Sequence, residues 1–483
     1  MRRWKWAALV FSLALSWAQG FDTLLPPGSV MGLGVRDLSQ QSGTFEPVRK
    51  EWERLDIDQR LAAILPSEEF ANLLPFLSLN TIEQGAALAL YPDGSFMALL
   101  QPNAEGRSSL ALQIKAWMPS PVQFGDWQVQ ETPELIYADN GKTFMVATPS
   151  VYSRFLAGER GNGFPPGDIV MWIEPQAAWP FLESMADTAS PETSPLVQSL
   201  LQDLRIFSSY TSSTWLEAKG IRTQSTIALN QAANPKLAQL FLPEGQPWPL
   251  TDLPQGIAIT STVFDLPFLG SYISELLSKS GINYGLDLTP FGTRIATVTL
   301  ASAAPTSQNS FLGDQIFLIE AVDPPTAAAL VTSWLQQLAA FSTPEGQGGF
   351  AIRPIENGNA ITVGLLGEVF LITQSDRLVL ATSQQALAAL QGPKFQGEIE
   401  AEDGAVSLSY SNTAEALHEQ GKMLTTALPM AISDPAGMQA YLNLAQGFQE
   451  FLEFLAQHSG PSTSTSKVQD GRFVTDGFWE VEF

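Results

Sequence analysis

The sequence predicts an α+β fold of two related halves, with mixed or mainly antiparallel sheets and helices packed on one side. Three observations support this prediction. Short apolar segments alternate with longer amphipathic ones, as strands and helices do. Tight polar turns join several of the apolar segments, which favours antiparallel hairpins. The same succession of segments also occurs twice. Of the 483 residues, 45% are hydrophobic and 15% are charged, which is enough apolar material for large cores.

The repeat is clearest between residues 134–156 (ELIYADNGKTFMVATPSVYSRFL) and 368–390 (EVFLITQSDRLVLATSQQALAAL). Each segment reads as an apolar strand, a polar turn with a basic residue, a second apolar strand and an Ala-Thr pair before a helix. Thr148 and Thr382, or the serine that follows each, are suited to cap that helix. We therefore predict an internal duplication.

Further landmarks recur in the same order in both halves. In the first half they are a strand at 97–101, a helix at 104–117, a strand at 167–174, a helix at 177–185 and a hairpin at 215–229 that turns at Lys219-Gly220; in the second they are a strand at 316–320, a helix at 325–338, a strand at 404–410, a helix from Thr413 and a hairpin at 467–483 that turns at Asp476-Gly477. Pro and Gly between 242 and 255 mark the joint. The predicted halves are residues 21–245 and 256–483, with a linker at 246–255.

The N-terminus, residues 1–20, has the layout of a secretory signal peptide. A basic start precedes an apolar run over 7–15, and small residues favour cleavage after Ala18 or Gly20. The run is too short to span a membrane. We therefore expect an exported protein, located in the periplasm, the cell envelope or outside the cell, whose mature chain has no transmembrane span. A bacterial source fits export without any cysteine.

Composition excludes several classes of function. The chain has no cysteine, two histidines and a net charge of −24. Disulfides, cysteine-ligated metals and cysteine nucleophiles are impossible. The acidic balance argues against nucleic acid as a partner. His418 has Lys422 where a helical metal motif needs a second histidine, and His458 lies far along the chain. We predict no cofactor and no enzymatic activity.

Carboxylates are the remaining candidates for catalysis. Glu134, Glu174 and Glu320 stand at predicted strand ends, where a site could form. Hydrolysis by paired acids requires two carboxylates held close together, one of them in an apolar setting. A formal Ser-x-x-Lys pattern at 464–467 lies in a Ser/Thr-rich stretch that we interpret as a flexible loop.

One acidic run is a weak candidate for calcium binding. Glu398, Glu400, Glu402 and Asp403 alternate within residues 397–404 (GEIEAEDG), so their oxygens could point the same way. The run lacks EF-hand spacing. A charged turn, or an edge strand protected against aggregation, is the alternative interpretation.

The chain resembles the DUF3352 family of exported bacterial proteins, to which no function is assigned. The resemblance rests on residues 25–38 (LPPGSVMGLGVRDL), 370–390 (FLITQSDRLVLATSQQALAAL) and 476–483 (DGFWEVEF). It implies an exported α+β protein over residues 24–483. It carries over no catalytic or binding residue.

These observations predict an exported, soluble, non-enzymatic envelope protein that binds an unknown envelope component or protein partner. The binding surface would lie between or across the halves, because domain interfaces commonly form clefts. Two alternatives stay open. The first is a carboxylate-dependent hydrolase with its site in the cleft between the halves. The second is a structural or assembly partner at the cell surface, which would expose a large apolar patch.

Overall fold

The structure is a computed structural model of the chain. It describes residues 24–38, 42–64, 84–161, 163–186, 194–279, 285–301, 313–342, 349–363, 367–397, 399, 403–426 and 435–483. The predicted signal peptide, residues 1–20, lies outside the described residues. Among those that are described, no helix has the length and apolar character needed to cross a membrane.

Helices and strands alternate along the whole described chain. The first half contains β1 (Met31–Val35), α2 (Ser42–Arg54), α3 (Ile57–Ile64), β2 (Ala86–Leu90), β3 (Phe96–Leu100), α6 (Ala104–Trp117), β4 (Val122–Phe124), β5 (Trp127–Glu131), β6 (Ile136–Asp139), β7 (Phe144–Ala147), α7 (Pro149–Leu156), β8 (Ile169–Ile173), α8 (Pro175–Ala186), α9 (Ser194–Leu204), β9 (Phe207–Glu217), β10 (Gly220–Leu229) and α10 (Pro235–Phe241). The second half contains a 3₁₀ turn, η4 (Leu250–Asp252), and then β11 (Ala258–Val263), α11 (Leu266–Lys279), β12 (Phe291–Thr299), β13 (Gln315–Ala321), α12 (Pro324–Ser342), β14 (Phe350–Ile355), β15 (Gly358–Val363), β16 (Glu368–Thr373), β17 (Arg377–Ala381), α13 (Gln384–Ala389), β18 (Ala405–Asn412), α14 (Thr413–Thr426), α15 (Pro435–Gln457), β19 (Ser459–Gln469) and β20 (Arg472–Val481). The α+β class is confirmed.

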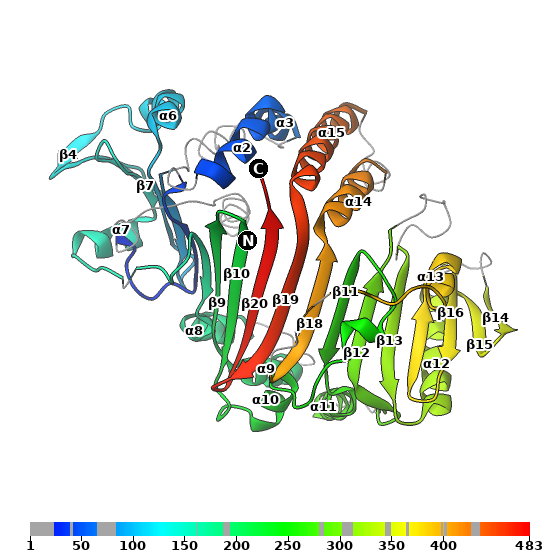
Figure 1. The fold of residues 1–483 in the computed structure, drawn as a ribbon. Coiled ribbons are helices and arrows are strands. Elements are labelled where there is room, and N and C mark those ends of the chain that lie inside the picture. The colour runs from blue at the N-terminus through cyan, green and yellow to red at the C-terminus, as the bar shows by residue number, and fades with distance from the viewer. Residues whose placement is uncertain are drawn as a thin grey trace.

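All twenty described strands form one continuous sheet with antiparallel pairing throughout (Figure 1). Across the sheet the order is β4-β5-β6-β7-β3-β2-β1-β8-β9-β10-β20-β19-β18-β11-β12-β13-β17-β16-β15-β14. Counted outward from the joint, the two halves have the same strand order: β20-β19-β18-β11-β12-β13-β17-β16-β15-β14 in the second half corresponds to β10-β9-β8-β1-β2-β3-β7-β6-β5-β4 in the first. The halves meet where β10 pairs with β20, Gly220 opposite Glu480 and Ala228 opposite Arg472.

The closing hairpin turns at a different place from the one predicted. Asp470 and Gly471 form the turn, with φ of 51° and 70°, as a two-residue hairpin loop requires. The predicted turn residues, Asp476 and Gly477, lie inside β20. The Ser/Thr-rich stretch at 462–467, predicted to be a flexible loop, lies in β19. Its residues are held by pairing with β18 and β20, which are contacts that the local sequence does not reveal.

Helices cover both faces of the sheet. We call the face that carries Leu100, Ser225 and Leu378 the helix face, and the opposite face the outer face. On the helix face, α6 packs on Leu100 and Phe144, and α12 packs on Leu378. On the outer face lie α7, which joins the core around Met145 and Val170, and α13, which joins the core around Phe370 and Val379. The prediction of helices on one side is therefore wrong for α7 and α13. They cover strands whose residues are apolar on both faces, such as β2, which is buried throughout.

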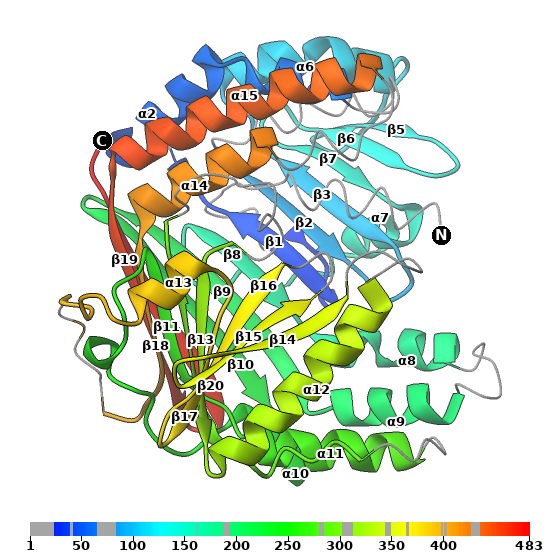
Figure 2. The ribbon, with the colours of Figure 1, turned by 90° about the vertical axis from the view of Figure 1, so that its right-hand side faces the viewer.

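Each half also contributes helices to the other. The α15 helix of the second half packs against α2 and α3 of the first, where the Trp52 ring meets Phe448 and Phe451 edge-on at 5.9 and 5.3 Å. Arg60 of α3 donates a hydrogen bond from Nη1 to the Asn443 carbonyl of α15 at 2.6 Å. These helices lie at one end of the central strands (Figures 1 and 2).

A second contact lies at the other end of the central strands, where α9 and α10 of the first half meet α11 of the second (Figure 2). The Tyr272 hydroxyl of α11 donates to Asp203 Oδ2 of α9 at 2.5 Å. Ile206 and Leu237 form an apolar cluster with Phe264 and Phe268. The two contacts are therefore alike: α15, which comes after β18, packs on α2 and α3, which come after β1, and α9, which comes after β8, packs on α11, which comes after β11.

The linker belongs to the second half. Trp248 is 3% exposed and packs in the core with Leu253 and Ile259. The guanidinium groups of Arg294 and Arg377 lie 5.1 and 4.7 Å from the centre of its rings, within the range of cation–π attraction.

We expect the two halves to stay together after the connection between them is cut. A protease site inserted between Glu244 and Gly245, which are both exposed, should allow cleavage of the folded full-length chain. Because β10–β20 pairing and two helix contacts hold the halves together, the cut protein should elute from a sizing column at the same volume as the uncut insertion variant, which is the control. Two half-sized species under native conditions would contradict this expectation.

Candidate functional site

The middle of the sheet carries two rows of hydroxyl side chains on its helix face. Cross-strand pairing aligns the rows over β9, β10, β20, β19, β18 and β11. One row is Thr214, Thr223, Gly477, Ser464, Ser409 and Thr260; the other is Ser212, Ser225, Thr475, Ser466, Ser407 and Thr262. We call these residues the hydroxyl band. Eleven of the twelve are Ser or Thr, and both halves contribute to it.

The band results from alternation within long strands. Successive side chains of a strand point to opposite faces, so Ser462, Ser464 and Ser466 of β19 face the same way. Towards one end of the strands, Leu216 and Ile221 pack with Phe45 of α2. Towards the other end, Phe207 and Leu229 pack with α10 and α11. Helices therefore cover the two ends of the central strands, and the band occupies the stretch between them.

The band is polar, uncharged and only partly buried. Ser466 is buried, Thr223 is exposed, and the other hydroxyl residues are half-buried. Thr260 and Ser409 share a hydrogen bond of 3.1 Å, and Ser466 and Thr475 share one of 2.8 Å.

Several hydroxyls of the band stay open to a ligand. Thr262 donates to the Val406 carbonyl, but within the described part of the chain six hydroxyls have no hydrogen-bond partner: those of Ser212, Thr214, Thr223, Ser225, Ser407 and Ser464. Each of them can both donate and accept a hydrogen bond.

Gly477 marks the one position in the band without a side chain. A Cβ there would lie 2.7 Å from Thr223 Oγ1 and 3.4 Å from Ser464 Cβ. The glycine therefore leaves room for the neighbouring hydroxyl, and it does not serve the turn that its Asp-Gly sequence predicts.

The three strand-end acids lie outside the band. Glu134 and Glu174 are exposed. Glu320 lies on the outer face in an ion pair, where its carboxylate accepts hydrogen bonds from Arg294 Nε at 2.9 Å and from the Thr293 amide at 2.8 Å. Burial alone would raise the pKa of Glu320, but these bonds to Arg294 and Thr293 hold its pKa below the ordinary value. A carboxylate fixed in this way is a poor general acid.

The calcium candidates are only partly covered by the structure. Glu398, Glu400 and Glu402 lie outside the described residues, and Asp403 is exposed. Within the described ranges, no group of three or more acidic or histidine side chains is placed to hold a metal ion. Calcium binding by the full run stays a prediction.

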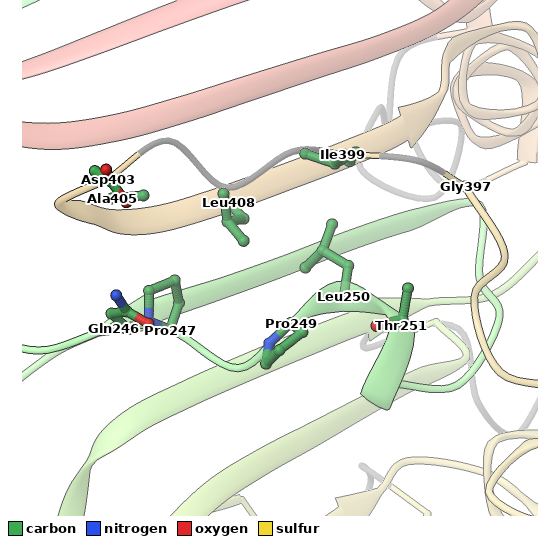
Figure 3. A pocket seen from close by; sticks show the side chains of 10 residues that line it. All are labelled: Gln246, Pro247, Pro249, Leu250, Thr251, Gly397, Ile399, Asp403, Ala405 and Leu408. Atoms are coloured by element: carbon green, nitrogen blue, oxygen red, sulfur yellow. The ribbon is translucent and has the colours of Figure 1, made fainter.

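Asp403 lies beside a small cavity of about 290 Å³ between the linker and β18. Leu250 of η4 and Leu408 of β18 point into it from opposite sides, and Asp403 lies at one end (Figure 3). Gln246 and Thr251 are its other polar residues. The volume is at the low end for a small-molecule site.

The two histidines have separate surroundings. His418 is exposed on α14. The His458 ring lies between Phe454 and Phe483, with centroids 4.9 and 5.0 Å away, and its Nδ1 is 2.8 Å from the Glu482 carbonyl. His458 therefore fastens the C-terminal residues to the end of α15.

The exposed large apolar side chains of the described residues are spread over several elements. They are Val122 and Phe124 of β4, Leu156 of α7, Leu200 and Leu204 of α9, Val322 between β13 and α12, Leu338 of α12, Ile352 of β14 and Phe478 of β20. Val122 and Phe124 of β4 are 71% and 56% exposed, and Ile352 of β14 is 47% exposed. β4 and β14 are the opposite ends of the strand order, so the side chains on these two strands do not lie together.

Comparison with known proteins adds little. No family model matches the chain, and no curated protein matches it. A solved structure described as "Structure of crystal form I of TP0453" aligns with a TM-score of 0.25 and 9% identity, over 44% of this chain and 79% of that chain.

Removing the Glu320 charge tests its structural role. Glu320→Gln should lower the free energy of unfolding at pH 7 by about 1–3 kcal/mol, because a charge-assisted hydrogen-bond set is weakened. The folded-state pKa is lowered, so the contribution is complete above about pH 4.5 and is lost as the pH falls through the folded value. The difference between the two proteins in the free energy of unfolding, measured by denaturant titration, should therefore shrink as the pH falls from 7 into the acid range. Glu134→Gln, at an exposed acid, is the matched control, and an equal loss there would refute the assignment.

Proposed function

We propose that this protein is an exported, soluble, non-enzymatic component of the cell envelope that acts by binding a polar, uncharged ligand at the hydroxyl band. The observation that carries the proposal is the band itself, with six hydroxyls whose hydrogen-bonding capacity is open. The band spans the joint of the two halves, and the sequence predicts recognition across the halves.

Binding suits the band better than catalysis does. A serine or threonine becomes a nucleophile when a neighbouring base activates it. The band consists of Ser, Thr and Gly alone, so it supplies no such base. What it offers is an array of donors and acceptors held in register by the strands, which is suited to orienting a ligand.

We propose further that the halves, residues 21–245 and 256–483 about the linker at 246–255, arose by duplication. The identical strand order supports this, as do two matching threonines. The Thr148 amide donates to the Phe96 carbonyl at 3.0 Å and Thr148 Oγ1 accepts from the Phe96 amide at 3.2 Å. Thr382 makes the same two bonds with Gln315, at 3.0 and 2.8 Å. Each threonine directly follows the seventh strand of its half and hydrogen-bonds to the first residue of the third strand.

The location and the family rest on the sequence alone. The layout of residues 1–20 supports export to the periplasm, the envelope or the exterior, and the three quoted segments support membership of the DUF3352 family. The partner would then be an envelope component that this protein meets after export.

A ligand at the band should raise the stability of the folded protein. At one hundred times its dissociation constant, a ligand that binds only the folded state stabilises it by about 2.7 kcal/mol. In a panel of neutral glycans, neutral peptides, acyl lipids and organic anions, we expect this shift in thermal unfolding with a neutral glycan or a neutral peptide and not with the other two classes. Ser225→Asp, which puts a charge in the band, should abolish it.

The adjacent residue supplies the control. Thr226 is half-buried on the outer face of the same strand, so Thr226→Asp should keep the ligand-induced shift. The proposed function fails if neither neutral class gives a shift, or if both variants respond alike.

A further inference from the structure

We propose that the ligand of the hydroxyl band is a linear, uncharged glycan that lies across the central strands. This inference rests on the proposed function and adds the chemical class of the ligand. Four features of the band support it: the type of its polar groups, its charge, its extent and two polar atoms at its border.

The polar groups of the band match those of a sugar. Serine and threonine hydroxyls each donate one hydrogen bond and accept others, and sugar hydroxyls do the same. An array made almost wholly of such groups can pair with a polyhydroxylated chain in many local arrangements. It lacks the fixed donor forks with which arginine recognises carboxylate or phosphate groups.

Charge points to an uncharged ligand. The band contains no charged residue, and the whole chain has a net charge of −24. An anionic polymer would meet repulsion without a compensating cation. A cationic one would lack a carboxylate partner within the band.

The position of the band argues against two other ligand classes. An extended peptide that recognises a sheet pairs with the free backbone of an edge strand, whereas β10 and β20 lie in the middle of the sheet and are paired on both sides. An acyl chain needs apolar surface, and the band presents hydroxyls in eleven of its twelve positions.

The extent of the band suits several sugar rings. It crosses six neighbouring strands, which at about 4.8 Å between strands gives roughly 24 Å. A single sugar would cover only part of this length. Affinity should therefore rise with the length of the glycan until the band is filled.

Two unpaired polar atoms border the band. Trp479 Nε1 and Thr413 Oγ1 are buried and without a hydrogen-bond partner. Trp479 follows Gly477 by two residues on β20, and cross-strand pairing through Ser462 links it to Ser411, two residues before Thr413. A buried polar atom without a partner is rare and calls for a water molecule or a ligand.

The test is isothermal titration of the full-length protein with cello-, malto- and chito-oligosaccharides of increasing length. At least one series should bind, more tightly as it lengthens. The double variant Thr223→Ala/Ser464→Ala removes two open hydroxyls of the band and should weaken binding roughly tenfold. The matched control is Thr226→Ala/Thr465→Ala, on the same two strands but on the outer face, and it should change affinity less than twofold. Circular dichroism and thermal unfolding establish that both variants fold.

The outcomes separate this inference from the proposed function. If no series binds, or if affinity does not depend on length, the glycan inference is overturned. If a neutral peptide stabilises the protein and that effect is lost with Ser225→Asp, the band still binds a polar, uncharged ligand and only the glycan class is wrong. If an organic anion or an acyl lipid does so, the proposed function is wrong as well. If a glycan binds and both double variants retain it equally, the band is not the site and both proposals fail.

Discussion

The antiparallel pairing of β10 with β20 is the interaction on which the rest of the structure depends. It joins the two halves into one sheet through the ladder from Gly220–Glu480 to Ala228–Arg472. These strands have little core of their own, since Gly220 and Val481 are their only buried residues. Backbone hydrogen bonds and cross-strand contacts must hold the joint there, and each contributes modestly. Support therefore has to come from elsewhere in the molecule.

That support comes from the helices at the two ends of the central strands. Trp52 against Phe448 and Phe451 fastens α15 to the first half, and the bond from Tyr272 to Asp203 fastens α11 to it at the other end. Both contacts bury apolar clusters, and burial of apolar surface is the strongest general source of stability. Because the described helices cover the strand ends, the middle of the helix face keeps its hydroxyls available among the residues that the structure describes. The same arrangement thus fixes the joint and leaves the band open for a ligand.

The sequence predicts the local features of this fold well. Apolar alternation and turn chemistry place most strands and helices, including the hairpin that turns next to Gly220, and the recurrence of Ala-Thr points to corresponding strands in the two halves. The predictions that fail depend on partners distant in sequence. Asp476-Gly477 has turn chemistry, yet pairing with β10 and β19 keeps it inside a strand. Ser462, Ser464 and Ser466 have a loop composition, and only their alternation signals a strand. The band itself needs the register of six strands, which one sequence does not provide. Of the acids that the sequence singles out, Glu320 is held in an ion pair with Arg294.

Native-state amide hydrogen exchange tests most directly whether the joint and the helix contacts act together. Exchange of Thr223, Ser225 and Thr475 should be compared between the unaltered protein and Trp52→Ala, which removes the ring contacts with Phe448 and Phe451 and the hydrogen bond to Asp58 of α3. These amides should be protected in the unaltered protein and should lose that protection in the variant, although Trp52 lies at the end of the central strands. Amides of β16 and β17, in the core of the second half, should keep theirs. Unchanged exchange of the central strands in the variant, or rapid exchange of them in the unaltered protein, would contradict this coupling.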